Sequence, residues 1–198
     1  VAADQVNGET FFMSSKDMCM IRHIPELEEA GISSYKIEGR VKSAYYTAVV
    51  TNTYRMALDA YRRDPSAYVF DEAWQRELDG VSHREYGTGF FFEKPCENAN
   101  TVTNLGYIRE KAYIATALDA VDNGDGTYEA RFYQRNKLTA GDQGEIISPG
   151  KCGQSFVCDI IRDDTGNEIP SAPHPGMVFR LRVPFPVKEG DILRLGGQ

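Results

Sequence analysis

The sequence has few cysteines, no long apolar run and no excess of basic residues. Its four cysteines, Cys19, Cys96, Cys152 and Cys158, are too few and too scattered for a disulfide framework in a chain of 198 residues. No apolar stretch is long enough to cross a bilayer, and no charged-then-apolar leader is present. These absences predict a protein of the reduced cytoplasm that does not enter a membrane.

The net charge of −7 limits the partners that the chain attracts as a whole. Acidic residues outnumber basic residues in both halves, so neither half is a polycation. We therefore expect neither DNA nor a membrane as a partner. An RNA partner is still compatible with this charge if a basic stripe exists locally.

Motifs of several enzyme classes are also missing. The chain has no Gly-rich phosphate-binding loop and no nucleophile elbow, and Cys152 and Cys158 lack partners at zinc-site spacing. His83 is a lone histidine of the kind that is more often structural than catalytic. Because no initiator methionine opens the chain, we expect it to be a piece of a longer protein.

The charged stretch 34–43 lies between two helical patterns. Residues 25–31 carry proline at the start and glycine at the end, the asymmetry typical of helix termini. Residues 32–37 are β-prone, and Ser43 is a suitable cap for a helix that continues to about residue 63. The predicted order of helix, strand, charged loop and helix is typical of a (β/α) barrel or a doubly wound sheet. A further short helix is predicted at about 71–78, with Trp74 as a packing anchor.

In such folds, the loop after a strand collects ligands and catalytic side chains. Arg40 follows Gly39 and precedes a helix start, where its guanidinium can grip a carboxylate or phosphate with two parallel hydrogen bonds. We therefore predict Glu38 and Arg40 as catalytic residues, with Lys36 and Lys42 as substrate-binding residues.

Three other interpretations of this stretch stay open. Residues 37–40 read Ile-Glu-Gly-Arg, a cleavage sequence engineered into many recombinant proteins, although tags lie at chain ends. The four charged side chains also fit a plain solvated face. In the third interpretation, an ion pair of Glu38 with Arg40 or with Lys36 only closes the end of the barrel.

A second strand–loop–helix unit is predicted at the start of the chain. Residues 10–13 read as a buried strand, and the serines at 14–15 read as a helix start. Cys19 then lies in or just beyond the first helical turn, at the same sheet edge as Arg40.

From residue 105 the apolar pattern changes to period two, which favours a small barrel or sandwich. Six strands are predicted, at 107–121, 127–134, 144–147, 155–161, 177–183 and 192–195. Gly-Asp pairs at 141–142 and 190–191 resemble the turns of accessory barrels in translation factors.

Alternation along two of these strands places basic side chains on one face. Arg131 and Tyr133 flank Phe132, and Arg180 lies between Phe179 and Leu181. If the two strands are neighbours, Arg131 and Arg180 are predicted to bind RNA phosphates, with Tyr133 available for stacking. The alternative is a solvated face.

Several spaced motifs agree in order with a known family. They are SSKDMC at 14–19, HIPEL at 23–27, YKIEGRVKS at 35–43, SHR at 82–84 and TGF at 88–90. Over roughly residues 11–92 the chain resembles the carboxyl-terminal part of peptidase family U32, the collagenase-like proteases.

The predicted fold class is α+β. Residues 1–92 are expected to form the terminal βα units of a (β/α) TIM-like barrel with the helices that follow them. A linker is expected at 93–104, and a small six-stranded β-barrel at 105–198.

The resemblance implies two alternative activities. Members are commonly labelled peptidases of unknown catalytic type, whereas bacterial relatives are linked to hydroxylation of RNA bases or of a quinone ring. Those relatives carry an iron–sulfur cluster bound by four cysteines, and the cysteine of the Lys-Asp-x-Cys segment is one ligand. Carried over, this implies Cys19 alone as a metal ligand, with the other ligands upstream of Val1. An inert, buried Cys19 is the alternative.

The main interpretation is therefore the carboxyl-terminal portion of a cytoplasmic U32-like enzyme that acts on a peptide or on tRNA or rRNA. The fragment by itself is expected to bind no cluster and to be inactive. The alternative function is a non-catalytic module whose β-barrel binds RNA or protein.

Overall fold

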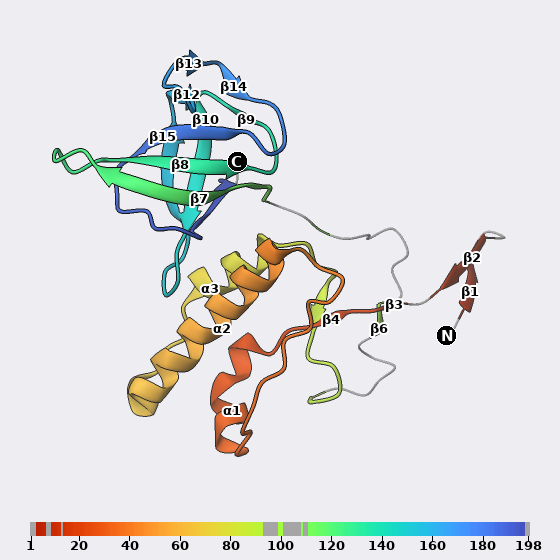
Figure 1. Cartoon of the computed structure of the whole chain (residues 1–198). Coiled ribbons are helices and arrows are strands. Elements are labelled where there is room, and N and C mark those ends of the chain that lie inside the picture. The colour runs from red at the N-terminus through yellow and green to blue at the C-terminus, as the bar shows by residue number, and fades with distance from the viewer. Residues whose placement is uncertain are drawn as a thin grey trace.

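The computed structural model describes residues 3–6, 9–12, 14–92, 99–100, 108 and 111–196, with backbone alone for 3–6, 9–12, 14–15 and 99–100. A helical unit and a curled β-sheet form two bodies that pack against each other (Figure 1). None of the helices in these ranges is long and apolar enough to span a bilayer. The predicted mixture of α and β structure is confirmed.

The start of the chain forms short paired strands. The segment β1 (Ala3–Val6) pairs with β2 (Glu9–Phe12), and β3 (Ser14–Ser15) pairs with β6 (Ala99–Asn100). The strand predicted at 10–13 is present as β2. The pairing with β6 falls inside the predicted linker 93–104, whose other residues lie outside the described part of the chain, as does Cys96.

The prediction of a helix that begins at residues 14–15 is wrong. The next segment, β4 (Asp17–Met18), instead runs parallel to β5 (Tyr86–Gly87), and the Cys19 amide donates to the Gly87 carbonyl at 2.9 Å. This pairing holds residues 17–18 extended, and the short 3-10 helix η1 (Ile21–His23) begins three residues after the end of β4. Cys19 therefore directly follows a strand and lies outside any helical turn.

The main helices lie where their capping residues predict. The helix α1 (Ile24–Glu29) has proline in its first turn and is followed by Gly31, whose φ of 77° suits glycine. The helix α2 (Ala44–Arg63) begins after Ser43, whose hydroxyl accepts a hydrogen bond from the Tyr46 amide at 3.2 Å. The Asp-Pro pair at 64–65 ends α2, because the residue before proline avoids helical backbone angles.

Two short helices complete this body. The segments η2 (Pro65–Ala67) and α3 (Glu72–Asp79) follow α2, and α3 packs against it. Trp74 is buried on α3, which confirms its predicted role as a packing anchor.

The strand predicted at 32–37 is wrong. The segment is extended, but no strand in the described part of the chain pairs with it. A strand requires the hydrogen-bond ladder of a neighbour. Tyr35 and Ile37 instead pack at the margin of the apolar cluster around α2.

The second body is an antiparallel sheet. Its strands are β7 (Tyr113–Asp122), β8 (Tyr128–Gln134), β10 (Asp142–Ile147), β11 (Gln154–Cys158), β12 (Ile161–Asp163), β13 (Glu168–Ile169), β15 (Val178–Val183) and β16 (Ile192–Leu195). They are ordered β11-β10-β16-β7-β8-β15-β12-β13. A separate pair, β9 (Leu138–Thr139) with β14 (Ser171–Ala172), lies beside them.

The predicted count of six strands is wrong, because this sheet has eight among the described residues. All six predicted segments contain strands, but 155–161 holds both β11 and the start of β12. The break falls at Asp159, whose carboxylate accepts a hydrogen bond from the Ile160 amide at 2.8 Å. The two residues of β13 are too few to show a period of two.

The predicted alternation builds the interior of this sheet. Phe132 of β8 stacks on Phe179 of β15, with ring centroids 5.6 Å apart, and both side chains are fully buried. Both predicted Gly-Asp turns are present, with φ of 93° at Gly141 and 88° at Gly190.

A buried ion cluster joins the two bodies. The fully buried guanidinium of Arg194 on β16 lies 2.8 Å from Glu77 of α3 and 2.7 Å from Glu145 of β10. It also donates to the Tyr45 hydroxyl at 3.3 Å. Lys111 donates to Glu145 at 2.8 Å, so two carboxylates meet two cations in this cluster.

Apolar and polar contacts surround the ion cluster. Ile147 and Ile192 of the sheet belong to the same apolar cluster as the α2 side chains. The Asn52 side chain on α2 donates to the Lys151 carbonyl at 2.9 Å and accepts from the Gly150 amide at 2.7 Å. The sheet therefore fixes the position of α2 at several points.

Replacing Arg194 with methionine (Arg194→Met) tests this junction. The change leaves Glu77 buried without its cation, and we expect the free energy of unfolding to fall by about 3–5 kcal/mol. The control is Arg182→Met, because Arg182 pairs with Asp125 in the open on the same sheet, where a pair contributes about 0–1 kcal/mol. Urea unfolding measures both variants. Equal losses would contradict the special role of the buried cluster.

Candidate functional site

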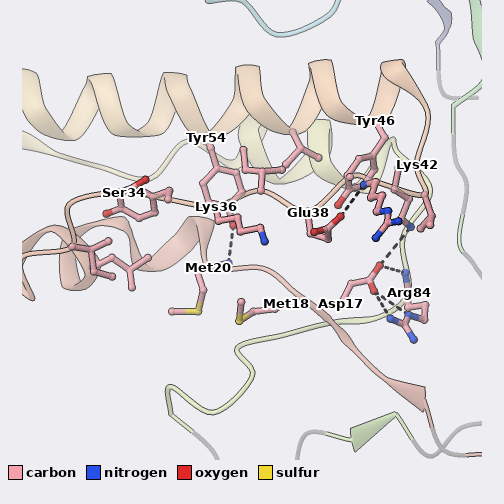
Figure 2. Close-up of a pocket in the computed structure, with 18 of the residues that line it drawn as sticks. Asp17, Met18, Met20, Ser34, Lys36, Glu38, Lys42, Tyr46, Tyr54 and Arg84 are labelled. Carbon is pink, nitrogen blue, oxygen red and sulfur yellow. Dashed lines mark hydrogen bonds and ion pairs between the residues drawn. The ribbon is translucent and has the colours of Figure 1, made fainter.

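The charged loop borders a cavity of about 450 Å³. The segment 32–42 forms one side, α2 lies above it, and the strand β4 with the following residues forms the other side (Figure 2). All four predicted side chains, Lys36, Glu38, Arg40 and Lys42, line this cavity. The structure therefore brings the predicted loop residues together at one concave surface.

The middle of the cavity is apolar. Met18 and Met20 face the loop across the cavity, and the Tyr54 ring reaches down from α2 (Figure 2). The Tyr54 hydroxyl accepts a hydrogen bond from the Met20 amide at 2.8 Å and donates to the Cys19 sulfur at 3.8 Å. Burial raises the pKa of the Tyr54 hydroxyl, which therefore stays neutral at neutral pH.

One end of the cavity is ionic. The Asp17 carboxylate accepts hydrogen bonds from the Arg84 amide at 3.0 Å and from its side-chain Nε at 2.9 Å. The Lys42 ammonium lies 3.9 Å from Asp17 and donates to the Ser82 carbonyl at 2.9 Å (Figure 2). One carboxylate thus faces two cations, and this end keeps a positive excess.

Neither ion pair of the structural alternative is present in the described part of the chain. Glu38 accepts a hydrogen bond from the Arg40 backbone amide at 2.8 Å, and its carboxylate pairs with neither Arg40 nor Lys36. The Arg40 guanidinium and the Lys36 ammonium make no hydrogen bond or ion pair with any described residue. Glu38 thus fixes the turn and leaves both cationic heads available to a ligand.

The cavity is cationic although the protein is acidic. Four cationic side chains line it, against two carboxylates, whereas the whole chain carries −7. Such a local field concentrates anions at the site. The geometry suits an anionic ligand that also has an apolar part.

Gly39 acts through close packing against α2. A Cβ atom at this position would lie 2.8 Å from the Thr47 hydroxyl oxygen. The backbone angle at Gly39 is not left-handed, so a conformation that only glycine adopts is not the reason for glycine here. The reason is the close approach of the loop to the first turns of α2.

Cys19 lies outside this cavity. It borders a smaller one of about 200 Å³ with Arg22, His23 and Tyr86, while Tyr54 connects the two. Cys19 and Arg40 were predicted to lie at one sheet edge, but in the structure they border two different cavities.

The described residues do not form a cluster site. Burial raises the pKa of the Cys19 thiol, so this environment does not by itself favour the thiolate that a metal requires. In the described ranges, no group of three or more His, Cys, Asp or Glu side chains is placed to hold a metal ion. Of the described cysteines, Cys19 alone borders the smaller cavity, and an iron–sulfur cluster bound by four cysteines needs three more.

The predicted basic face of the sheet carries both charges. The strands β8 and β15 are neighbours, as the prediction required, and Arg131 lies opposite Arg180. Arg131, however, pairs with Asp119 at 2.5 Å, and Arg180 pairs with Glu129 at 3.2 Å. RNA binding by this face stays a prediction.

Tyr133 and His83 have distinct settings. Tyr133 is 36% exposed, and the Arg135 guanidinium lies 4.8 Å from its ring centre. His83 is buried, stacks on Tyr86 at 4.1 Å and contacts the Arg84 carbonyl through Nδ1 at 2.6 Å. Its Nε2 has no hydrogen-bond partner among the described residues.

Two family models match successive parts of the chain. The model of peptidase family U32 matches residues 2–101, and the model of the U32 C-terminal domain matches residues 109–194.

The chain belongs to peptidase family U32.

Relatives in this family carry two kinds of name. The "tRNA hydroxylation protein P1" of Bacillus subtilis is 32% identical over 94% of this chain and 43% of its own length. The "tRNA hydroxylation protein P" of Escherichia coli is 31% identical over 88% of this chain and 37% of its own length. A "Collagenase" of Porphyromonas gingivalis is 27% identical over 70% of this chain and 38% of its own length. The chain thus spans less than half the length of these U32 relatives.

A solved structure resembles part of the chain. It is the C-terminal domain of a "putative U32 peptidase" from Geobacillus thermoleovorans, which is 27% identical to this chain. The match covers 42% of this chain and 91% of the solved domain, with a TM-score of 0.38.

Sequence reasoning missed several side chains of the cavity. Asp17 and Arg84 form its ionic end, and Met18, Met20 and Tyr54 form its apolar wall. Asp17, Met18 and Arg84 stand inside the U32 motifs at 14–19 and 82–84, which was the signal available. Nothing in the sequence indicates that these two distant segments meet, because their contact depends on the pairing of β4 with β5.

Gly39→Ala tests the packing of the loop against α2. The added methyl group meets a stiff, β-branched side chain, and we expect a loss of about 1–3 kcal/mol in the free energy of unfolding. The double variant Gly39→Ala/Thr47→Ala removes the clashing oxygen and should recover most of this loss, with Thr47→Ala alone as the reference. Thermal melting measures all three. A double variant no more stable than Gly39→Ala would contradict the clash.

Proposed function

We propose that this chain is the carboxyl-terminal portion of a U32 protein that hydroxylates tRNA. In the intact protein, residues 1–92 complete a TIM-like (β/α) barrel, 93–104 link the two units, and 105–198 form an accessory barrel of the translation-factor kind. The cavity beside the charged loop binds the RNA substrate. The protein works in the cytoplasm.

The relatives support tRNA as the substrate. The two tRNA hydroxylation proteins match across both the helical unit and the sheet, at 94% and 88% of this chain. The collagenase match is lower in identity and covers 70%. The matches cover only 43% and 37% of the lengths of the two tRNA hydroxylation proteins, so the activity belongs to the intact protein.

The single observation that carries the proposal is that two cationic side chains at the cavity rim have no partner among the described residues. The side chains of Lys36 and Arg40 make no hydrogen bond or ion pair with described residues, although the chain is rich in carboxylates. A guanidinium that is not neutralised by the protein is suited to bidentate contact with a phosphate. Glu38 positions this guanidinium through the Arg40 amide.

Peptide hydrolysis is the second candidate function. The collagenase relative favours it, and the same cationic rim also fits a peptide carboxylate. The two candidates differ in what they require: a peptidase needs an activated nucleophile at the scissile bond, which tRNA hydroxylation does not.

We also propose Cys19 as one ligand of an iron–sulfur cluster in the intact protein. Cys19 directly follows β4 and borders a cavity, and the Tyr54 hydroxyl already donates to its sulfur. The other thiolates come from outside this chain. The cluster supplies redox chemistry when bound, and the residues of this chain hold and orient the substrate.

Arg40→Lys in the intact protein tests the main proposal. Lysine keeps the charge but loses the two-pronged contact, so we expect the Kd for tRNA to rise about tenfold, since a hydrogen bond to a charged group contributes about 1.5–3 kcal/mol. The hydroxylated nucleoside in tRNA from cells that carry only this variant should fall in parallel. Arg63→Lys, at the exposed end of α2, is the control. Loss of collagen-peptide cleavage with normal tRNA hydroxylation would favour the second candidate.

Cys19→Ser in the intact protein tests the ligand proposal. A serine oxygen is a poor replacement for a thiolate, so iron per chain should fall well below that of the parent protein. Cys152→Ser is the matched control, because Cys152 is another half-buried thiol of this chain. Iron is measured by elemental analysis of anaerobically purified protein. Equal iron in the two variants would end the proposal.

A further inference from the structure

We infer that the cavity beside the charged loop holds one unstacked nucleotide, with its base against Met18, Met20 and Tyr54 and its phosphate at the Arg40 and Lys42 end. This inference deepens the proposed function and rests on it. It adds a division of the site into a base part and a phosphate part.

The apolar part lies open although apolar side chains normally avoid water. Met18 is 64% exposed and Phe91, which also lines the cavity, is 55% exposed. Tyr54 of α2 adds an aromatic ring to the lining of the same cavity. Thioether groups make favourable contacts with flat aromatic rings, and aromatic side chains stack on their faces.

The ionic part offers donors suited to phosphate oxygens. Lys42 and Arg84 surround the single carboxylate of Asp17, and the Arg40 guanidinium makes no hydrogen bond or ion pair with described residues. Lys42 and Arg84 lie on the same cavity as the two methionines (Figure 2), and Arg40 lines that cavity as well. A ligand that spans the cavity therefore needs an anionic end and a flat apolar end, which a nucleotide has.

The size of the cavity limits the ligand to one unit. A volume of about 450 Å³ lies in the range of sites for small molecules, about 300–1,000 Å³. A base inside a duplex cannot enter such a space. The nucleotide must leave its stack first, as in other enzymes that perform chemistry on a base.

The four nucleoside 5′-monophosphates, their nucleosides and inorganic phosphate are the probes. Calorimetry with the intact protein should show at least one monophosphate binding at least about tenfold tighter than its nucleoside and tighter than phosphate. The same monophosphate should compete with tRNA.

Variants separate the two parts. Arg40→Ala should weaken the monophosphate and phosphate but leave the nucleoside unchanged. Met18→Ala should weaken the monophosphate and nucleoside about fivefold, because the shorter side chain covers less of the base, and Met18→Leu should restore binding. Arg63→Ala and Val69→Ala, both exposed and outside the cavity, are the controls.

The outcomes distinguish this inference from the proposed function. Phosphate binding as tightly as every monophosphate, no binding of any probe, or nucleoside binding unaffected by Met18→Ala overturns the nucleotide site while tRNA hydroxylation still stands. Displacement of the monophosphate by an acidic peptide that binds more tightly overturns it in favour of a peptide ligand. Absence of any tRNA binding by the intact protein overturns the proposed function itself.

Discussion

The buried Arg194 cluster is the interaction on which the arrangement of this molecule depends. A fully buried guanidinium costs several kcal/mol to desolvate, and the carboxylates of Glu77 and Glu145 offset most of that cost. Because Glu77 comes from the helices and Glu145 from the sheet, neither body satisfies Arg194 alone. The hydroxyl of Tyr45, in the first turn of α2, completes the cluster. The sheet thereby fixes the end of α2 from which the charged loop extends, so a remote strand of the sheet sets the position of the candidate site.

Local signals in the sequence predicted much of the fold. Proline in the first turn of α1, Ser43 before α2 and the Asp-Pro pair after α2 each act within a few residues, so the helices lie where these residues indicate. The failures have the opposite cause. Residues 32–37 have strand composition but no described neighbour to pair with, and residues 14–18 have a helix-start composition but are held extended by strands from residues 86–87 and 99–100. In both segments the outcome depends on whether a distant strand is there to pair with, and composition does not encode that.

The candidate site divides in the same way. The loop residues Glu38 and Arg40 were predictable because they follow one another in the chain beside a helix start. The hydrogen bond from the Arg40 amide to Glu38 was not predictable, since spacing alone also allows an ion pair of the two side chains. That one contact changes the interpretation: a paired arginine closes a structure, whereas an arginine without a described partner on a cationic cavity is suited to bind an anion. Arg131 and Arg180 of the sheet differ from Arg40 in this respect, because the carboxylates of Asp119 and Glu129 pair with them.

The central claim is that Lys36 and Arg40 contact RNA phosphates, and the salt dependence of tRNA binding tests it most directly. Each phosphate contact contributes about 0.7–0.9 to the slope of log K against log salt concentration. For the intact protein with Lys36→Ala/Arg40→Ala, the account predicts a slope flatter by about 1.5 than in the parent. The control Arg63→Ala/Lys188→Ala makes the same change in net charge outside the cavity and should leave the slope unchanged. Equal slopes for the parent and the Lys36→Ala/Arg40→Ala protein would contradict the account.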